Sequence, residues 1–90
     1  MTITEFLEAR IAEDEAEARK YQQYEKDVWE TAGWWEPTRV LAECKAKRDL
    51  IAILTPGQEI WDGTRWARPL DIMAAVYADH PDYREEWRHA

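Results

Sequence analysis

The stretch Gly33-Trp34-Trp35-Glu36-Pro37 decides the fold, because it separates two segments whose apolar residues recur at helical spacing. Pro37 suits the first turn of a helix, where its missing N–H leaves no hydrogen bond unmade. Thr55-Pro56-Gly57 stops this second helix at about Leu54. A short connection makes consecutive helices antiparallel neighbours. The sequence therefore predicts a helical hairpin that turns at residues 33–37.

The segment before this turn reads as one long amphipathic helix. Thr2 and Glu5 have the spacing of a capping box, in which each side chain satisfies a backbone N–H at the helix start. No Gly or Pro interrupts the chain from there to Gly33, and the face opposite the apolar stripe is charged. The stripe consists of Ile3, Leu7, Ile11, Ala18, Tyr21, Val28 and Ala32, with Phe6 and Tyr24 beside it.

Three charged residues fall inside the apolar stripes of the two helices. Asp14 and Glu25 interrupt the first stripe, and Lys47 interrupts the second. A buried charge without a partner is costly, so each should be paired or hydrated. Antiparallel packing brings Glu25 level with residues 44–47, and we expect a Glu25–Lys47 pair, with Asp14 near the end of the second helix. The second stripe consists of Val40, Cys44, Ile51 and Leu54, with Leu41 and Leu50 at its edges.

Residues 60–66 have the pattern of a minimal β-hairpin, with an irregular loop as the alternative. Asp62-Gly63 favours a type I′ turn between Ile60-Trp61 and Arg65-Trp66. A hairpin this short is not stable alone. We therefore expect Trp61 and Trp66 to dock on the helices.

The C-terminal third predicts a helix and a short final helix. Pro69 can open a helix over residues 69–78, and Asp79-His80-Pro81-Asp82 ends it and starts another that runs to about Arg88. Tyr83 and Trp87 should share one side of the last helix. Apolar residues occur on most sides of the earlier helix, which indicates central burial: Leu70, Met73, Ala74 and Tyr77 on one face, and Ile72 and Val76 elsewhere.

These elements predict an all-α fold, in which the helical hairpin, the third helix and the short C-terminal helix form a small bundle. Ninety residues suffice for one domain, so we expect residues 1–90 to be a single helical domain. Its core must be small at this length, and the six Trp, four Tyr and one Phe either fill it or wait for a partner.

Composition limits the classes of function. The net charge is −7, from 12 basic and 19 acidic residues, and an acidic chain repels phosphate, which disfavours direct nucleic-acid binding. Cys44 is the single cysteine, so no intrachain disulfide forms. No apolar run approaches the roughly 18 residues of a membrane span, and the N-terminus lacks the pattern of a signal peptide. We expect a cytoplasmic protein.

Three blocks of the sequence form a recognisable set: residues 6–11 with 13–15, residues 37–41 with 45–48, and the segment Tyr77-Ala78-Asp79-His80-Pro81-Asp82-Tyr83-Arg84-Glu85-Glu86-Trp87-Arg88. Together they resemble a family of small proteins of actinobacteria and their phages that has no assigned activity. The last block is the most specific. Relatives carry a longer Gly- and His-containing stretch between the first two helices, where this chain has residues 29–36. The resemblance implies a source and no mechanism.

Non-catalytic protein binding is the function that the sequence favours. Trp and Tyr in turns are typical of binding hot spots, and they can also cap the ends of a bundle. The partner would be a host protein or, through the first helix, a second copy of the chain. The predicted surface comprises the turn tryptophans Trp34, Trp35, Trp61 and Trp66 and the acidic residues Glu13 and Glu17 of the first helix.

Two other classes of function stay open. Asp79, His80 and Asp82, with Glu85 or His89, could hold a metal or ligand, although a helix-cap turn explains the same segment. Alternatively, Glu13, Asp14, Glu15 and Glu17 could imitate DNA phosphates and inhibit a host DNA-binding protein. No cofactor motif appears. Cys44 reads as a buried thiol, Asp14, Glu25 and Lys47 read as structural pairs, and the basic residues Lys45, Lys47 and Arg48 read as a paired or solvated face.

Overall fold

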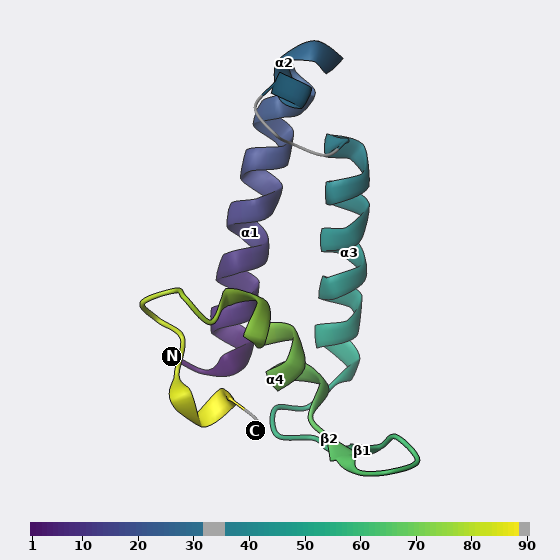
Figure 1. Cartoon of the computed structure of the whole chain (residues 1–90), viewed down its shortest axis with the longest axis vertical. Coiled ribbons are helices and arrows are strands. Elements are labelled where there is room, and N and C mark those ends of the chain that lie inside the picture. Colours follow the sequence, from purple (N-terminus) through teal and green to yellow (C-terminus); the bar gives the residue numbers. More distant parts are fainter. Residues whose placement is uncertain (32–35, 89–90) are drawn as a thin grey trace.

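The computed structural model describes residues 1–31 and 36–88 and has two long antiparallel helices with the C-terminal third packed across one end (Figure 1). This confirms the predicted all-α hairpin with its minor β-hairpin. The molecule measures 44 × 28 × 21 Å, and its radius of gyration is 15.1 Å. A compact domain of this length has a radius of gyration of about 12 Å. The chain is therefore elongated for its size.

Helix α1 (Ile3–Gln22) begins at the predicted capping box but ends earlier than expected. The Thr2 hydroxyl accepts a hydrogen bond from the Glu5 N–H, and the Glu5 carboxylate accepts one from the Thr2 N–H. The helix breaks at residues 23–25, and α2 (Lys26–Thr31) follows. Tyr24 and Val28 are 49% and 43% exposed, so little tertiary packing supports a continuous helix there.

Helix α3 (Pro37–Ile53) has the predicted bounds to within one residue and lies beside α1 (Figure 1). Cys44 and Ile51 of its stripe are buried against the first half of α1. The core is confined to the lower half of the hairpin in Figure 1, where α4 also packs. It consists of Ile3, Phe6, Leu7, Ile11, Cys44, Ile51, Leu70, Ala74 and Trp87.

The predicted β-hairpin forms from β1 (Ile60–Trp61) and β2 (Trp66–Ala67), which pair antiparallel with Trp61 opposite Trp66. Two details of the prediction are wrong. A type I′ turn needs a positive φ at both central residues, but of Asp62 and Gly63 only Gly63 has one (102°), so the turn is not type I′. Trp61 and Trp66 remain 53% and 63% exposed instead of docking on the helices, because they pack against each other with ring centroids 5.6 Å apart.

Helix α4 (Pro69–Ala74) continues as the 3₁₀ turn η1 (Ala75–Tyr77), in agreement with the predicted helix over residues 69–78. The expected central burial is wrong, because Ile72 and Val76 are 55% and 76% exposed. Only the side that carries Leu70 and Ala74 is buried, where α4 meets α1.

The expected final helix is also wrong, because the segment contains a single 3₁₀ turn, η2 (Glu85–Trp87). Turns closed by the His80 and Tyr83 N–H groups precede it, and Arg84 has an extended backbone. Tyr83 and Trp87 both contact Phe6 from this irregular segment, so these contacts do not need a regular helix. Among the described residues, no helix has the length and apolar character needed to cross a membrane.

Candidate functional site

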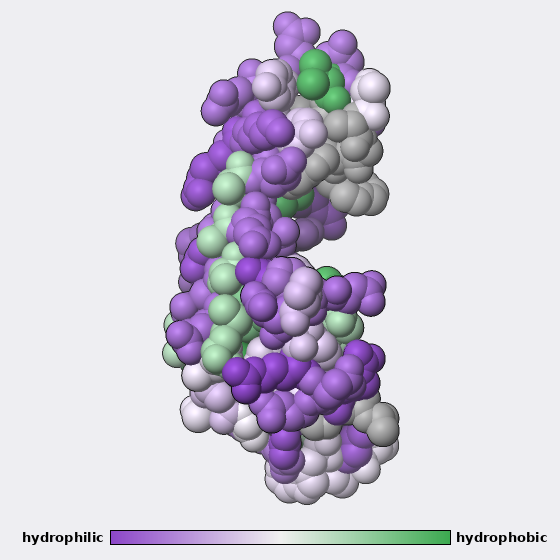
Figure 2. Space-filling view, turned by 90° about the vertical axis from the view of Figure 1, so that its left-hand side faces the viewer, coloured by the Kyte–Doolittle hydropathy of each residue, from purple (hydrophilic) through white to green (hydrophobic). Residues whose placement is uncertain are grey.

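The C-terminal motif, residues 77–88, packs around Phe6 of α1. The Phe6 side chain is fully buried. The ring centroids of Tyr77, His80, Tyr83 and Trp87 lie 6.1, 5.7, 6.1 and 5.0 Å from that of Phe6. Most of these contacts are edge-on, the geometry that aromatic rings prefer. The motif thus contributes Trp87 to the core, and its Tyr77 and Tyr83 pack against that core. The face that α1 and the C-terminal segment present to solvent is mostly hydrophilic (Figure 2).

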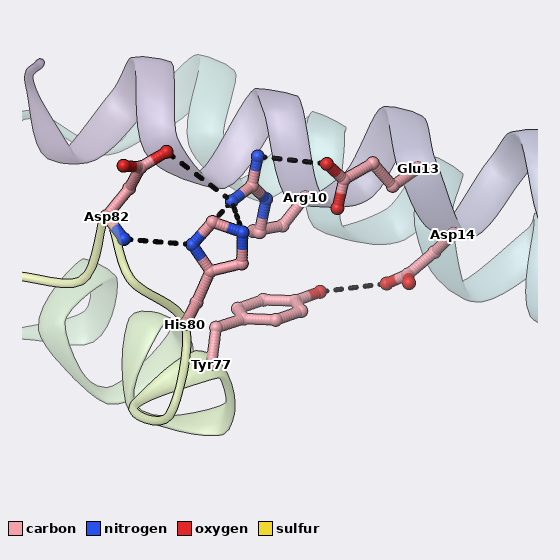
Figure 3. A network of polar contacts seen from close by, with 6 residues as sticks. All are labelled: Arg10, Glu13, Asp14, Tyr77, His80 and Asp82. Atoms are coloured by element: carbon pink, nitrogen blue, oxygen red, sulfur yellow. Dashed lines mark hydrogen bonds and ion pairs between the residues drawn. The ribbon is translucent and has the colours of Figure 1, made fainter.

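His80 contacts a buried arginine, as Figure 3 shows. Arg10 is 7% exposed, and its Nη1 contacts the His80 ring while its Nη2 donates to Glu13 Oε1 at 3.0 Å. The Asp82 N–H donates to His80 Nδ1 at 3.0 Å, and the Asp82 carboxylate lies 4.0 Å from Arg10 Nη1. The lone pair of His80 Nδ1 accepts from the Asp82 N–H, and the Arg10 guanidinium, which can only donate, lies against the same ring.

This arrangement bears on the predicted metal site at Asp79, His80 and Asp82. The Arg10 cation lies beside the His80 imidazole and near the Asp82 carboxylate, and its positive charge would repel a metal ion bound to them. Within residues 1–31 and 36–88, no group of three or more His, Cys, Asp or Glu side chains is placed to hold a metal ion. The described segment is a turn that docks on α1, and Pro81 lies exposed at its tip.

Asp14 finds its partner in the motif as well. The Tyr77 hydroxyl donates to Asp14 Oδ2 at 2.9 Å, which joins η1 to α1 (Figure 3). Burial raises the pKa of the Tyr77 phenol above its usual value of 10, and the hydrogen bond to the Asp14 carboxylate raises it further. The acid that interrupts the apolar stripe of α1 is therefore part of the packing of the C-terminal motif.

The predicted Glu25–Lys47 pair is wrong. Glu25 lies exposed in the break after α1, because the helix ends at Gln22, and the ion pairs formed by the described residues do not include it. The charged contact between the two helices is instead made by Glu15 and Arg48, whose Oε1 and Nη2 lie 2.6 Å apart. The Arg48 hydrogen bond lowers the pKa of the Glu15 carboxyl.

Two further side chains of α3, those of Cys44 and Lys45, are shielded or engaged. Cys44 is 2% exposed, and burial raises the pKa of its thiol, which keeps it in the poorly nucleophilic protonated form. Lys45 pairs with Asp49 at 2.9 Å on the solvent side of the helix. Neither residue has the surroundings of a catalytic group.

An apolar groove lies between the C-terminal end of α3, the β-hairpin and α4. Its volume is about 560 Å³, and almost all of its lining atoms are apolar. Four large aliphatic side chains in it are 45–75% exposed: Leu50, Ile53, Ile60 and Ile72. The other lining residues are Leu54, Asp62, Ala67, Pro69 and Met73. This groove is the clearest candidate for a functional site in the described part of the chain.

The two hairpin tryptophans lie next to this groove and not in it. Ile60 and Ala67 line the groove, and successive strand residues point to opposite faces, so Trp61 and Trp66 project from the other face of the hairpin. The turn between them is held by Asp62, whose Oδ1 accepts from the Thr64 N–H and hydroxyl and from the Arg65 N–H. These bonds lower the pKa of Asp62 from 3.8 to about 2.

The other predicted binding residues have differing surroundings. Glu13 is engaged by Arg10, and Glu17 is exposed on α1. Trp34 and Trp35 lie outside the described residues. Asp14 and Glu15 are engaged by Tyr77 and Arg48, so three of the four acids of the predicted phosphate-like array already have partners inside the molecule.

Sequence reasoning missed the groove, although a signal for it was present. Ile53 and Ile72 fall off the apolar stripes of their helices, and off-stripe apolar residues can be exposed instead of centrally buried. It also missed Arg10, although the helical spacing gave a signal for its burial. In α1 this residue follows the buried Ile3, Phe6 and Leu7 at the spacing of the core stripe.

Comparison with known proteins gives a family and no activity. The model of a family of unknown function, DUF6221, matches residues 1–89. No curated protein and no solved structure matches the chain. The match covers both the C-terminal motif and the groove, so the two regions belong to one family unit.

Proposed function

We propose that this chain, which belongs to the DUF6221 family of unknown function, is a non-catalytic binding protein that holds an apolar segment of a partner protein in its groove. The exposure of Leu50, Ile53, Ile60 and Ile72 around one groove carries this proposal. Covering apolar surface is favourable by roughly 25 cal/mol per Å² before the entropic costs of association are subtracted, so a partner that covers the groove is favoured. Clustered exposed apolar residues mark interaction sites in soluble proteins.

The character of the groove supports binding without chemistry. Asp62 is the single titratable residue that lines it, and its Oδ1 is already committed to the turn. Trp61 and Trp66 add to the surface from the neighbouring face of the hairpin, and tryptophan is the residue type most enriched at binding hot spots. The resemblance to proteins of actinobacteria and their phages supports a host protein as the partner.

The test compares groove variants with an exposed neighbour. The immobilised protein captures partners from an actinobacterial lysate, mass spectrometry identifies them, and purified partners are then measured for direct binding. Ile53→Lys and Ile72→Lys place a charge in the groove and should weaken binding at least about tenfold, because the charge must be buried. Val76→Lys adds the same charge at a side chain that is 76% exposed and does not line the groove, so binding should persist.

The same comparison can refute the proposal. All three positions are more than half exposed, so the variants should fold like the wild type, which circular dichroism checks. If the wild-type protein captures nothing beyond what the Ile53→Lys/Ile72→Lys double variant captures, the groove is not the binding site.

A further inference from the structure

We propose, resting on the binding function above, that the segment held in the groove is a basic amphipathic α-helix of the partner protein. Three properties of the groove lead to this assignment: its apolar lining, its position at the end of α3, and the charge of the molecule around it.

The lining favours a helix over an extended peptide. The groove presents apolar side-chain atoms and almost no polar ones, so it offers no row of hydrogen-bonding partners to a backbone. An extended peptide would bury its own N–H and C=O groups there unpaired, which is costly. A helix satisfies its backbone internally and presents apolar residues at i, i+3, i+4 and i+7 along one stripe.

The end of α3 favours positive charge on that helix. Ile53, which lines the groove, is the last residue of this 17-residue helix, and the C-terminal end of a helix carries partial negative charge. No basic residue of the helix lies in its last turn to offset this charge. A lysine or arginine of the partner beside the groove would supply the missing complement.

The charge of the whole molecule acts in the same direction. The net charge is −7, and residues 1–30 alone hold nine acids and four bases. Asp62, the one charged residue of the groove lining, is paired with Arg65, and in the flanking segments Asp49 is paired with Lys45 and Glu59 with Arg68. The attraction is therefore long-range, speeds the approach of a cationic partner and weakens with salt. A second copy of the chain, equally acidic, is repelled.

A panel of synthetic peptides tests the assignment with defined probes. The first peptide places Leu at helical spacing with Lys on the other face, the second replaces Lys by Glu, and the third keeps the Leu/Lys composition in a strictly alternating, β-type order. Binding is measured by calorimetry at low and high salt. The Leu/Lys helix should bind, the Glu version should bind at least about tenfold more weakly, and affinity for the Leu/Lys helix should fall with added salt.

Matched protein variants separate groove binding from general attraction of a cationic peptide. Ile72→Lys should abolish the binding of the Leu/Lys helix, while Val76→Lys, which makes the same change in charge four residues away, should leave it within about twofold. Equal loss in both variants would show that charge alone holds the peptide, and this would overturn the assignment.

The remaining outcomes distinguish this inference from the proposed function. If the alternating or the Glu peptide binds best and Ile72→Lys abolishes that binding, the groove is a binding site and the basic helix is wrong. If sedimentation shows the wild-type chain dimerising and Ile72→Lys makes it monomeric, the occupant is a second copy. If Ile72→Lys affects neither peptide binding nor the lysate partners, both proposals fail.

Discussion

The C-terminal motif and the region of the groove and the β-hairpin contain similar apolar and aromatic residues, but the first is packed into the core and the second is exposed. Around Phe6, the rings of the C-terminal motif pack into the core, and Trp87 is 7% exposed. At the hairpin end, Trp66 is 63% exposed and Ile53 is 75% exposed. The comparison teaches that apolar content alone does not mark a core. What matters is whether a second element covers the residue, and α1 covers the motif while no described element covers the groove.

The largest expected effect comes from the buried side of this comparison. Phe6→Ala removes a fully buried ring that four aromatic side chains contact, and it should lower the free energy of unfolding by about 3–5 kcal/mol. Trp66→Ala, at the exposed side, should change it by no more than about 0.5 kcal/mol. Urea denaturation followed by circular dichroism measures both. Equal losses in the two variants would contradict the division into core and surface.

The next effect concerns the polar tie between the motif and α1. Tyr77→Phe removes the hydrogen bond to the Asp14 carboxylate and should lower the free energy of unfolding by roughly 1–2 kcal/mol. Because burial and this bond raise the pKa of Tyr77, the contribution of the protonated phenol to folding stability is full below pH 10 and is lost as the pH rises through the raised pKa. Ultraviolet titration should show one tyrosine that ionises later than the others, and that component should be absent in Tyr77→Phe.

A smaller effect is expected for the ion pair between α1 and α3. The Arg48 side chain is 40% exposed, so solvent screens its interaction with Glu15, and a double-mutant cycle should give a coupling energy of about 0.5–1 kcal/mol. Because Arg48 lowers the pKa of Glu15, this coupling is present above pH 4.5 and disappears as the pH falls through the lowered value. A coupling that is unchanged in acid and in high salt would contradict the contact.

The smallest effect on global stability is expected at the hairpin turn. The hydrogen bonds from Thr64 and Arg65 lower the pKa of Asp62 to about 2. Their contribution to the stability of the turn is therefore complete above about pH 4 and is lost as the pH falls through 2. The circular dichroism signal of the coupled Trp61–Trp66 pair should fade over this window. Asp62→Ala should already lack that signal at pH 7, with an unchanged urea midpoint. A large shift of that midpoint would show that the hairpin belongs to the core.

The sequence predicted the elements whose signals are local. The capping box at Thr2, the proline start of α3 and the Asp-Gly hairpin each depend on a few neighbouring residues, and all three are present. The break after Gln22 was not predicted, because neither Gly nor Pro causes it. It coincides with the high exposure of Tyr24 and Val28, which depends on tertiary packing and not on local sequence.

The candidate site was predicted poorly for a related reason. The spacing of Ile72 and Val76 shows that they lie off the buried face of α4, but it cannot show whether another element covers them. Likewise, the register of α1 and α3 depends on where the turn ends, and a helix that stops at Gln22 removes Glu25 from the interface and brings Glu15 to Arg48. Trp61 and Trp66 were singled out by residue type, and their role in binding stays a prediction.

The isoleucine methyl groups test the central claim most directly, because they occur in both regions. In a methyl-labelled sample, a soluble paramagnetic agent should broaden the groove signals of Ile53, Ile60 and Ile72 and spare the core signals of Ile3, Ile11 and Ile51. The Leu/Lys helix should then protect the three groove methyls from the agent. Groove methyls that are already shielded in the free protein, or that stay broadened when the peptide is bound, would contradict the account.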